Sequence, residues 1–216
     1  MRTRILSFLA LALIAITIGY FILKPSSGLP VFQVSQINPE LVDPSVRNEK
    51  GEHHIKDFHL IDQDGASVSL ATVKGKVVLA DFFFTTCGSI CPKMSTQMTR
   101  VQEAFHDDDR VLLLSHSVTP EQDSVPVLKA YADQYGTDHR RWRLLTGDRK
   151  QIYDLARTSW FAAKGTGDGG PNDFVHTENF VLADTQGRLR GFYDGTSPKE
   201  VDRAIADIRT LLKEGE

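Results

Sequence analysis

Apolar and polar positions along the chain follow periods that predict strands and helices in alternation. After a hairpin signal around Asp64-Gly65, residues 77–84 form a nearly continuous apolar run, which is typical of a strand buried on both faces of a sheet. Residues 92–106 follow with apolar positions at helical spacing. The further predicted elements are strands at 111–118 and 142–147, helices at 120–135 and 150–158, a hairpin over 174–195 and a last helix from residue 197 or 198.

This order of elements predicts a thioredoxin-like α/β fold, with a central mixed β-sheet flanked by helices, over residues 53–216. The composition agrees with a packed domain, because 41% of the 216 residues are hydrophobic and 25% are charged. A formal net charge of -3 provides no basic surface that could neutralise phosphates. We therefore expect no nucleic-acid partner.

The N-terminal residues predict a membrane anchor. Residues 5–23 carry no charge and would span about 28 Å as a helix, close to the thickness of a bilayer's hydrocarbon core. Arg2 and Arg4 precede this stretch and only Lys24 follows directly, which places the N-terminus in the cytoplasm and the domain outside. A cleaved signal peptide is the alternative, but its apolar region would be about 7–15 residues long and followed by a small-x-small site.

We expect residues 1–24 to form a single-pass transmembrane anchor in a bacterial cytoplasmic membrane, since no long basic, serine-rich transit segment precedes the apolar stretch. Residues 25–52 contain four prolines and show weak periodicity, so they predict an extended linker. The domain would then lie in the periplasm or outside the cell, where thiols are readily oxidised.

The chain has two cysteines, Cys87 and Cys91, which directly follow the first buried strand. If they lie in the first turn of the helix that Pro92 begins, their Cβ atoms are about 5–6 Å apart. The two sulfurs could then form a disulfide or hold one soft metal ion, and neither outcome excludes the other. The positive end of the helix dipole would lower the pKa of both thiols. A purely structural bridge is disfavoured, because so short a loop would restrict the unfolded chain little.

Two further residues are candidates for chemistry at the cysteines. His176, one of seven histidines, lies at the start of a predicted strand behind a glycine-rich loop and could supply a third ligand. Its position alone does not separate this role from that of a hydrogen-bonded structural histidine. Asp81 stands in an apolar strand six residues before Cys87, the offset at which thioredoxins keep a buried carboxylate. It is either a proton relay for the second thiol or a hydrogen-bonded core aspartate.

Four segments, DFFFTTCGSICPKM, SHSVTPEQDS, LLTGD and DFVHTENFVLAD, together resemble the Sco (SenC/PrrC) family of membrane-anchored, thioredoxin-fold copper proteins. The similarity runs from about residue 53 to 213. It implies that Cys87, Cys91 and His176 bind copper, as Cu(I) or Cu(II), and that the protein serves assembly of the dinuclear copper centre of cytochrome c oxidase. Thr119 stands where many members carry an acidic residue, so the chain departs from the family pattern there.

Two functions remain open at this point. A copper metallochaperone would hand its metal to a copper-bearing oxidase subunit, or to another extracytoplasmic copper or thiol protein, and would not be an enzyme. A thiol-disulfide oxidoreductase would instead cycle Cys87 and Cys91 through a mixed disulfide. The spacing of three residues between the thiols and the presence of His176 favour the first function, whereas Asp81 favours the second. A peroxiredoxin-like peroxidase is disfavoured, because Phe84 stands where its threonine would be required.

Overall fold

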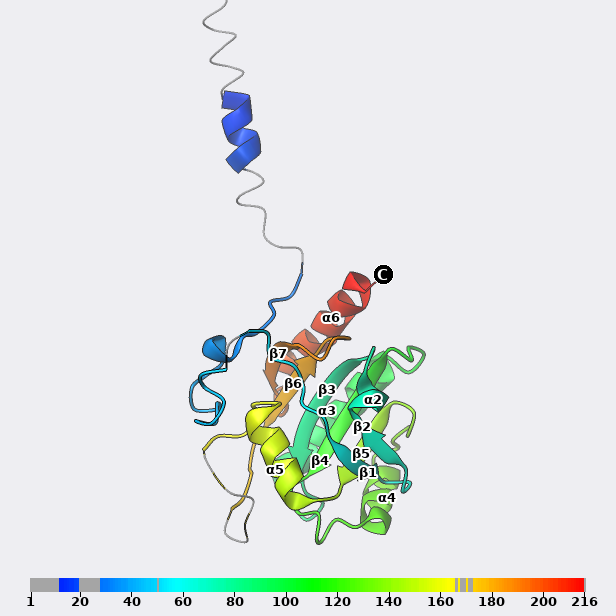
Figure 1. Ribbon diagram of the computed structural model, residues 1–216. Coiled ribbons are helices and arrows are strands. Elements are labelled where there is room, and N and C mark those ends of the chain that lie inside the picture. The colour runs from blue at the N-terminus through cyan, green and yellow to red at the C-terminus, as the bar shows by residue number, and fades with distance from the viewer. Residues whose placement is uncertain are drawn as a thin grey trace, which may run out of the picture.

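The structure is a computed structural model that describes residues 12–19, 28–49, 51–165, 167, 170 and 173–215 (Figure 1). Seven strands of the described chain form one mixed sheet in the order β2-β1-β5-β4-β3-β6-β7. The strands are β1 (His59–Asp62), β2 (Ser67–Ser69), β3 (Val77–Phe83), β4 (Val111–Ser117), β5 (Trp142–Thr146), β6 (Asn179–Ala183) and β7 (Leu189–Asp194). The helices are the 3-10 helix η1 (Val34–Gln36) and α2 (Leu70–Val73), α3 (Ile90–Ala104), α4 (Val125–Gln134), α5 (Arg149–Thr158) and α6 (Pro198–Glu214).

The centre of the sheet is parallel and its flanks are antiparallel. β4 pairs in parallel with β3 on one side and with β5 on the other, whereas β1 and β6 run antiparallel to their neighbours. Every residue of β3 and β4 is buried, as expected for parallel strands covered on both faces. The arrangement confirms the thioredoxin-like α/β fold predicted from the order of elements.

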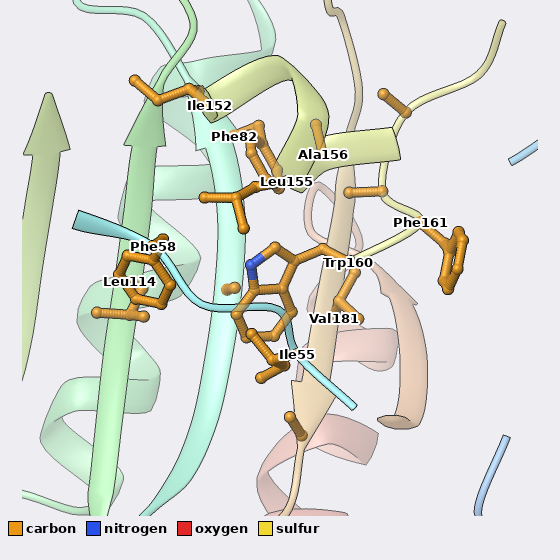
Figure 2. Close-up of a cluster of buried hydrophobic side chains, with 14 of the residues drawn as sticks. Ile55, Phe58, Phe82, Leu114, Ile152, Leu155, Ala156, Trp160, Phe161 and Val181 are labelled. Carbon is orange, nitrogen blue, oxygen red and sulfur yellow. The ribbon is translucent and has the colours of Figure 1, made fainter. Parts of the chain in front are cut away.

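Each face of the sheet has its own hydrophobic core. Leu79 and Phe83 of β3 belong to the cluster that α3, α4 and α6 cover, which also contains Met94 and Met98. The opposite face is covered mainly by α5 and by the loop that follows it (Figure 2). There Trp160 is completely buried in the same cluster as Ile55, Leu155 and Val181. Alternate residues of β3 therefore serve different cores, since successive side chains of a strand point to opposite faces.

Two predicted element boundaries are wrong by five residues. α4 begins at Val125 and not at residue 120, because Asp123 turns inward and accepts hydrogen bonds from the cysteine loop and from the end of β4. β6 begins at Asn179 and not at residue 174, because Thr177 donates a hydrogen bond from its side chain to the carbonyl of Ala162 outside the sheet. α2 is a short helix that the sequence pattern did not predict.

Residues 28–49, part of the predicted extended linker, lie against the domain. Apart from η1 they contain little regular structure, as expected, but five of their side chains are buried in the core on the α5 side of the sheet. Arg190 of β7 fastens the start of this segment by donating hydrogen bonds to the carbonyls of Leu29 and Pro30. The backbone N–H of Leu29 donates to Glu214 at the end of α6. The five buried side chains are Val34, Ile37, Leu41, Val42 and Val46.

Of the predicted transmembrane span at 5–23, the structure describes residues 12–19, which form a helix with exposed apolar side chains. The other residues of that span lie outside the described part of the chain. Within the described part, no helix combines the length and the apolar character needed to cross a membrane.

Candidate metal and thiol site

The two cysteines lie where β3 ends and α3 begins. The backbone N–H of Cys87 donates to the carbonyl of Phe84 at 3.2 Å, which closes a turn directly after β3. Cys91 lies in the first turn of α3, and its backbone N–H donates to the sulfur of Cys87 at 3.5 Å. Both thiols are free and buried, with 8% of Cys87 and 2% of Cys91 exposed. Cys87 precedes the helix instead of lying within it, so the turn, and not helical spacing, holds it close to Cys91.

The two thiols have different acidities. Burial by itself would raise the pKa of Cys87, but hydrogen bonds from the backbone N–H groups of Cys91 and Ser89 outweigh burial and lower this pKa to about 7. Deeper burial raises the pKa of Cys91 to about 12. About half of Cys87 is therefore thiolate at neutral pH, and Cys87 is the nucleophile of the pair, whereas Cys91 keeps its proton.

Asp81 is buried in the middle of β3, on the same face as the cysteines. It pairs with Ser115 of β4 in the sheet register and is 2% exposed. Burial raises the pKa of Asp81 to about 7, although a hydrogen bond with Ser115 opposes the rise. Its Oδ1 atom is buried without a hydrogen-bond partner, and its charge contributes to the raised pKa of Cys91. A carboxyl group in this state can take up or release a proton near neutral pH.

His176 lies in the irregular segment 173–178 that precedes β6, and not at the start of the strand as predicted. Its side chain is exposed. The segment is fixed on both sides of His176. Asp173 forms a buried ion pair with Arg157, with two N–O distances of 2.7 and 2.5 Å, and Thr177 is bound to the carbonyl of Ala162. His176 is thus an outward-facing side chain on an anchored backbone.

An aromatic contact places this segment beside the cysteine loop. The ring of Phe174 packs edge-on against the ring of Phe84, with 5.3 Å between the centroids. Phe174 is two residues from His176, and Phe84 is three residues from Cys87. Among the described residues, however, no three histidine, cysteine, aspartate or glutamate side chains are close enough together to hold a metal ion. The structure therefore brings the two sulfurs together and leaves the imidazole on a neighbouring segment.

Sequence reasoning missed one residue that supports the site. Asp123 is fully buried, and its carboxylate accepts hydrogen bonds from the side chains of Thr85, Ser117 and Thr119. Thr119 is the residue that departs from the acidic position of the Sco pattern, and here it acts as a hydrogen-bond donor. An acidic residue followed by Ser124, a typical helix N-cap, was the signal available in the sequence, but it does not reveal a partner 38 residues away.

Comparison with known proteins identifies the family. A sequence model of the SCO1/SenC family matches residues 46–213. The chain belongs to the SCO1/SenC family. A family relative, the SCO1 protein homolog of Bacillus subtilis, is 34% identical over 160 residues, which cover 73% of this chain and 82% of the relative.

Solved structures of SCO1/SenC family members agree with this assignment. BsSco, a member of the Sco family of cytochrome c oxidase assembly proteins in which a disulfide switch was identified, is 33% identical, with a TM-score of 0.63 over 74% of this chain and 94% of that one. ScoI of Bradyrhizobium japonicum with copper bound is 28% identical, with a TM-score of 0.59 over 73% of this chain and 99% of that one. The fold of this SCO1/SenC protein is therefore shared with a protein that has a disulfide switch and with a protein whose structure contains copper.

Proposed function

We propose that this protein binds copper through Cys87, Cys91 and His176, and that it delivers the copper to the dinuclear copper site of cytochrome c oxidase or prepares the thiols of that site. The observation that carries the proposal is the pair of free thiols, held by the 3.5 Å contact between the Cys91 N–H and the Cys87 sulfur, beside the segment that bears His176. The copper-bound ScoI structure and the assembly role of BsSco support it.

The donor atoms suit copper as cargo. Thiolates are soft ligands that select Cu(I), and imidazole is a ligand for copper in both oxidation states. Cys87 is already about half thiolate at neutral pH, whereas Cys91 must lose its proton on ligation. His176 must turn from solvent toward the cysteine loop, and its exposed side chain is free of hydrogen bonds to the described residues that would oppose this rotation.

Anaerobic titration of the purified protein with Cu(I) tests the proposal. The reduced protein is expected to bind one copper ion per chain, and the protein with an oxidised Cys87–Cys91 pair is expected to bind far less. His176→Ala should weaken binding by about tenfold or more, since it removes one donor of three. His139→Ala is the matched control, because His139 is also exposed but lies just before β5, at the end of the parallel strands opposite the cysteines.

Comparison of the two histidine variants distinguishes the loss of a copper ligand from the general effect of removing an exposed imidazole. Equal affinity of His176→Ala and His139→Ala would remove His176 from the site. Copper binding that does not depend on the oxidation state of the cysteines would overturn the proposal as a whole.

Thiol-disulfide exchange is the second candidate function, and the acidities of the two thiols favour it. The Cys87 thiolate would attack a partner disulfide, releasing one partner thiolate and forming a mixed disulfide. Cys91 would then attack the Cys87 sulfur and release the second partner thiolate, with its own proton passing to Asp81. Cys91→Ser should trap the mixed disulfide, and Cys87→Ser should not. Absence of a trapped species with an oxidised glutathione probe would contradict this function.

We also propose that residues 5–23 anchor the protein in a bacterial cytoplasmic membrane with the domain outside. The uncharged stretch and the two preceding arginines support this arrangement. Protease added to intact spheroplasts should degrade the domain. Full protection of the domain in intact spheroplasts, together with digestion after lysis, would place it in the cytoplasm and contradict the proposal.

A further inference from the structure

Asp123 joins two loops at the edge of the sheet where β3 and β4 end. Its carboxylate accepts two hydrogen bonds from Thr85, one from the backbone N–H at 3.2 Å and one from the hydroxyl at 2.5 Å. It accepts two more from the hydroxyls of Ser117, at 2.5 Å, and Thr119, at 3.0 Å. Thr85 belongs to the turn before Cys87, whereas Ser117 and Thr119 belong to the end of β4 and the loop after it. One side chain thus connects the cysteine loop to the neighbouring strand.

This carboxylate is held without a cation. Asp123 has no exposed surface, and in the described chain it forms no ion pair with lysine or arginine. A buried carboxylate is costly unless hydrogen bonds replace its lost hydration, and the four donors supply that replacement. Any movement of Thr85 away from Ser117 breaks some of these bonds and leaves polar groups unsatisfied in the interior. The two loops are therefore locked together.

Thr85, which Asp123 holds in place, determines where Cys87 lies. Thr85 is in the turn that the hydrogen bond between the Cys87 N–H and the Phe84 carbonyl closes. Because Cys87 precedes α3, this turn holds its backbone, whereas its sulfur accepts a hydrogen bond from the Cys91 N–H in the first turn of α3. The backbone of Val118 adds a second connection, since its N–H donates to the carbonyl of Phe83 at 2.8 Å.

We propose that Asp123 is a positioning residue for the cysteine pair. By holding Thr85, it fixes the turn that keeps the sulfur of Cys87 next to Cys91, and it thereby sets the stability of the disulfide that the pair forms. The inference rests on the proposed function only in taking Cys87 and Cys91 as the reactive pair.

The thiol-disulfide equilibrium with glutathione tests this role. One dithiol and one oxidised glutathione give one Cys87–Cys91 disulfide and two reduced glutathiones, so the equilibrium constant measures how well the two sulfurs are placed. Asp123→Asn keeps the shape of the side chain but removes its charge and half of its acceptor capacity. We expect the equilibrium constant for disulfide formation in the full-length protein to fall about tenfold, since loss of preorganisation lowers the effective concentration of the two thiols.

Asp184→Asn is the matched control. Asp184 is also a buried carboxylate with several hydrogen bonds, from the backbone N–H groups of Gln186 and Arg188 and from the side chain of Arg190. It lies in the turn between β6 and β7, at the end of the sheet where β3 starts and thus opposite the cysteines. Its replacement should lower thermal stability but leave the glutathione equilibrium within about twofold of the wild-type value.

A folded Asp123→Asn protein whose equilibrium constant matches that of Asp184→Asn would overturn the proposal. If Asp123→Asn does not fold, Thr85→Val decides, since it removes one hydroxyl donor and keeps the backbone N–H. We expect Thr85→Val to lower the constant about threefold, because one of four hydrogen bonds is lost, and an unchanged constant would contradict the positioning role. No copper is present in this experiment, so failure of copper binding and failure of the Asp123 role are separate results.

Discussion

The ring of Phe174 meets the ring of Phe84 edge-on, with an interplanar angle of 80°. This contact joins the segment that carries His176 to the strand end that leads to the cysteines. The two segments are far apart in the sequence, and the sheet alone does not hold them together, because residues 173–178 lie outside β6. Phe174 remains 49% exposed, so it adds little to the hydrophobic core, and its contact with Phe84 mainly positions the segment that carries His176.

Phe174→Ala should therefore weaken copper binding without large loss of stability. An aromatic pair contributes about 0.5–1.5 kcal/mol, which corresponds to an expected decrease in copper affinity of about twofold to tenfold. Phe32→Ala is the control, because Phe32 makes a similar edge contact with Phe192, at 5.5 Å and 83°, on the β7 side of the sheet. Competition with a Cu(I) chelator measures both affinities. Equal affinities would show that the Phe84 contact does not position His176.

The two thiols should react at different rates. Because the pKa of Cys87 is lowered to about 7 and that of Cys91 is raised to about 12, iodoacetamide should modify Cys87 first at every pH between 6 and 9. The rate at Cys87 should rise with pH and level off above about pH 8, as its thiol becomes fully ionised. Peptide mapping by mass spectrometry after short pulses measures this order. Equal labelling of both residues would contradict the assignment of Cys87 as the nucleophile.

Asp81→Asn should change how stability depends on pH. Burial raises the pKa of Asp81 from 3.8 to about 7, so the folded protein holds this proton more tightly than the unfolded chain does. The favourable contribution is complete below pH 3.8 and is lost as the pH rises through 7. Asparagine stays neutral, so at pH 8 the variant should exceed the wild type in free energy of unfolding by as much as about 4 kcal/mol. Urea denaturation at pH 4.5 and pH 8 measures the difference, and a difference independent of pH would contradict the buried, protonated state.

Removal of the N-terminal segment should destabilise the domain. A protein that begins at residue 53 loses Val34, Ile37, Leu41 and the other buried side chains of residues 28–49. We expect it to be less stable than a protein that begins at residue 25 by more than about 3 kcal/mol, given about 1.5–3 kcal/mol for each buried aliphatic side chain. Coincident urea transitions for the two proteins would show that the segment is a detached linker after all.

The fold was predictable because its signals are local. β3 and β4 are continuous apolar runs, and the helices that follow them have apolar positions at helical spacing, so their types and order could be predicted without knowledge of contacts. The N-terminal segment was harder to interpret. Its prolines indicate irregular structure, which is correct, but irregular structure can still be packed when it carries buried side chains such as Val34 and Ile37.

The site was predictable only in its residue types. Cys87 and Cys91 stand out by their spacing, and Asp81 by its place in an apolar strand. The geometry that supports them depends on contacts between distant positions, which spacing does not encode. Asp123 reaches Thr85 across 38 positions, and Phe174 reaches Phe84 across a still longer stretch of chain.

The hydrogen bonds of Leu29 with Arg190 and Glu214 determine at which end of the domain the N-terminal segment is attached. Arg190, which binds Leu29, follows Leu189; Leu189 pairs with Ala183, and Ala183 pairs with Val78 near the start of β3. Leu29 therefore lies at the end of the sheet where β3 starts, whereas Cys87 follows the end where β3 finishes. The attachment point at Leu29 and the reactive cysteines thus lie at opposite ends of the sheet. A partner that reacts with the thiols would therefore approach the end of the domain that lies opposite Leu29.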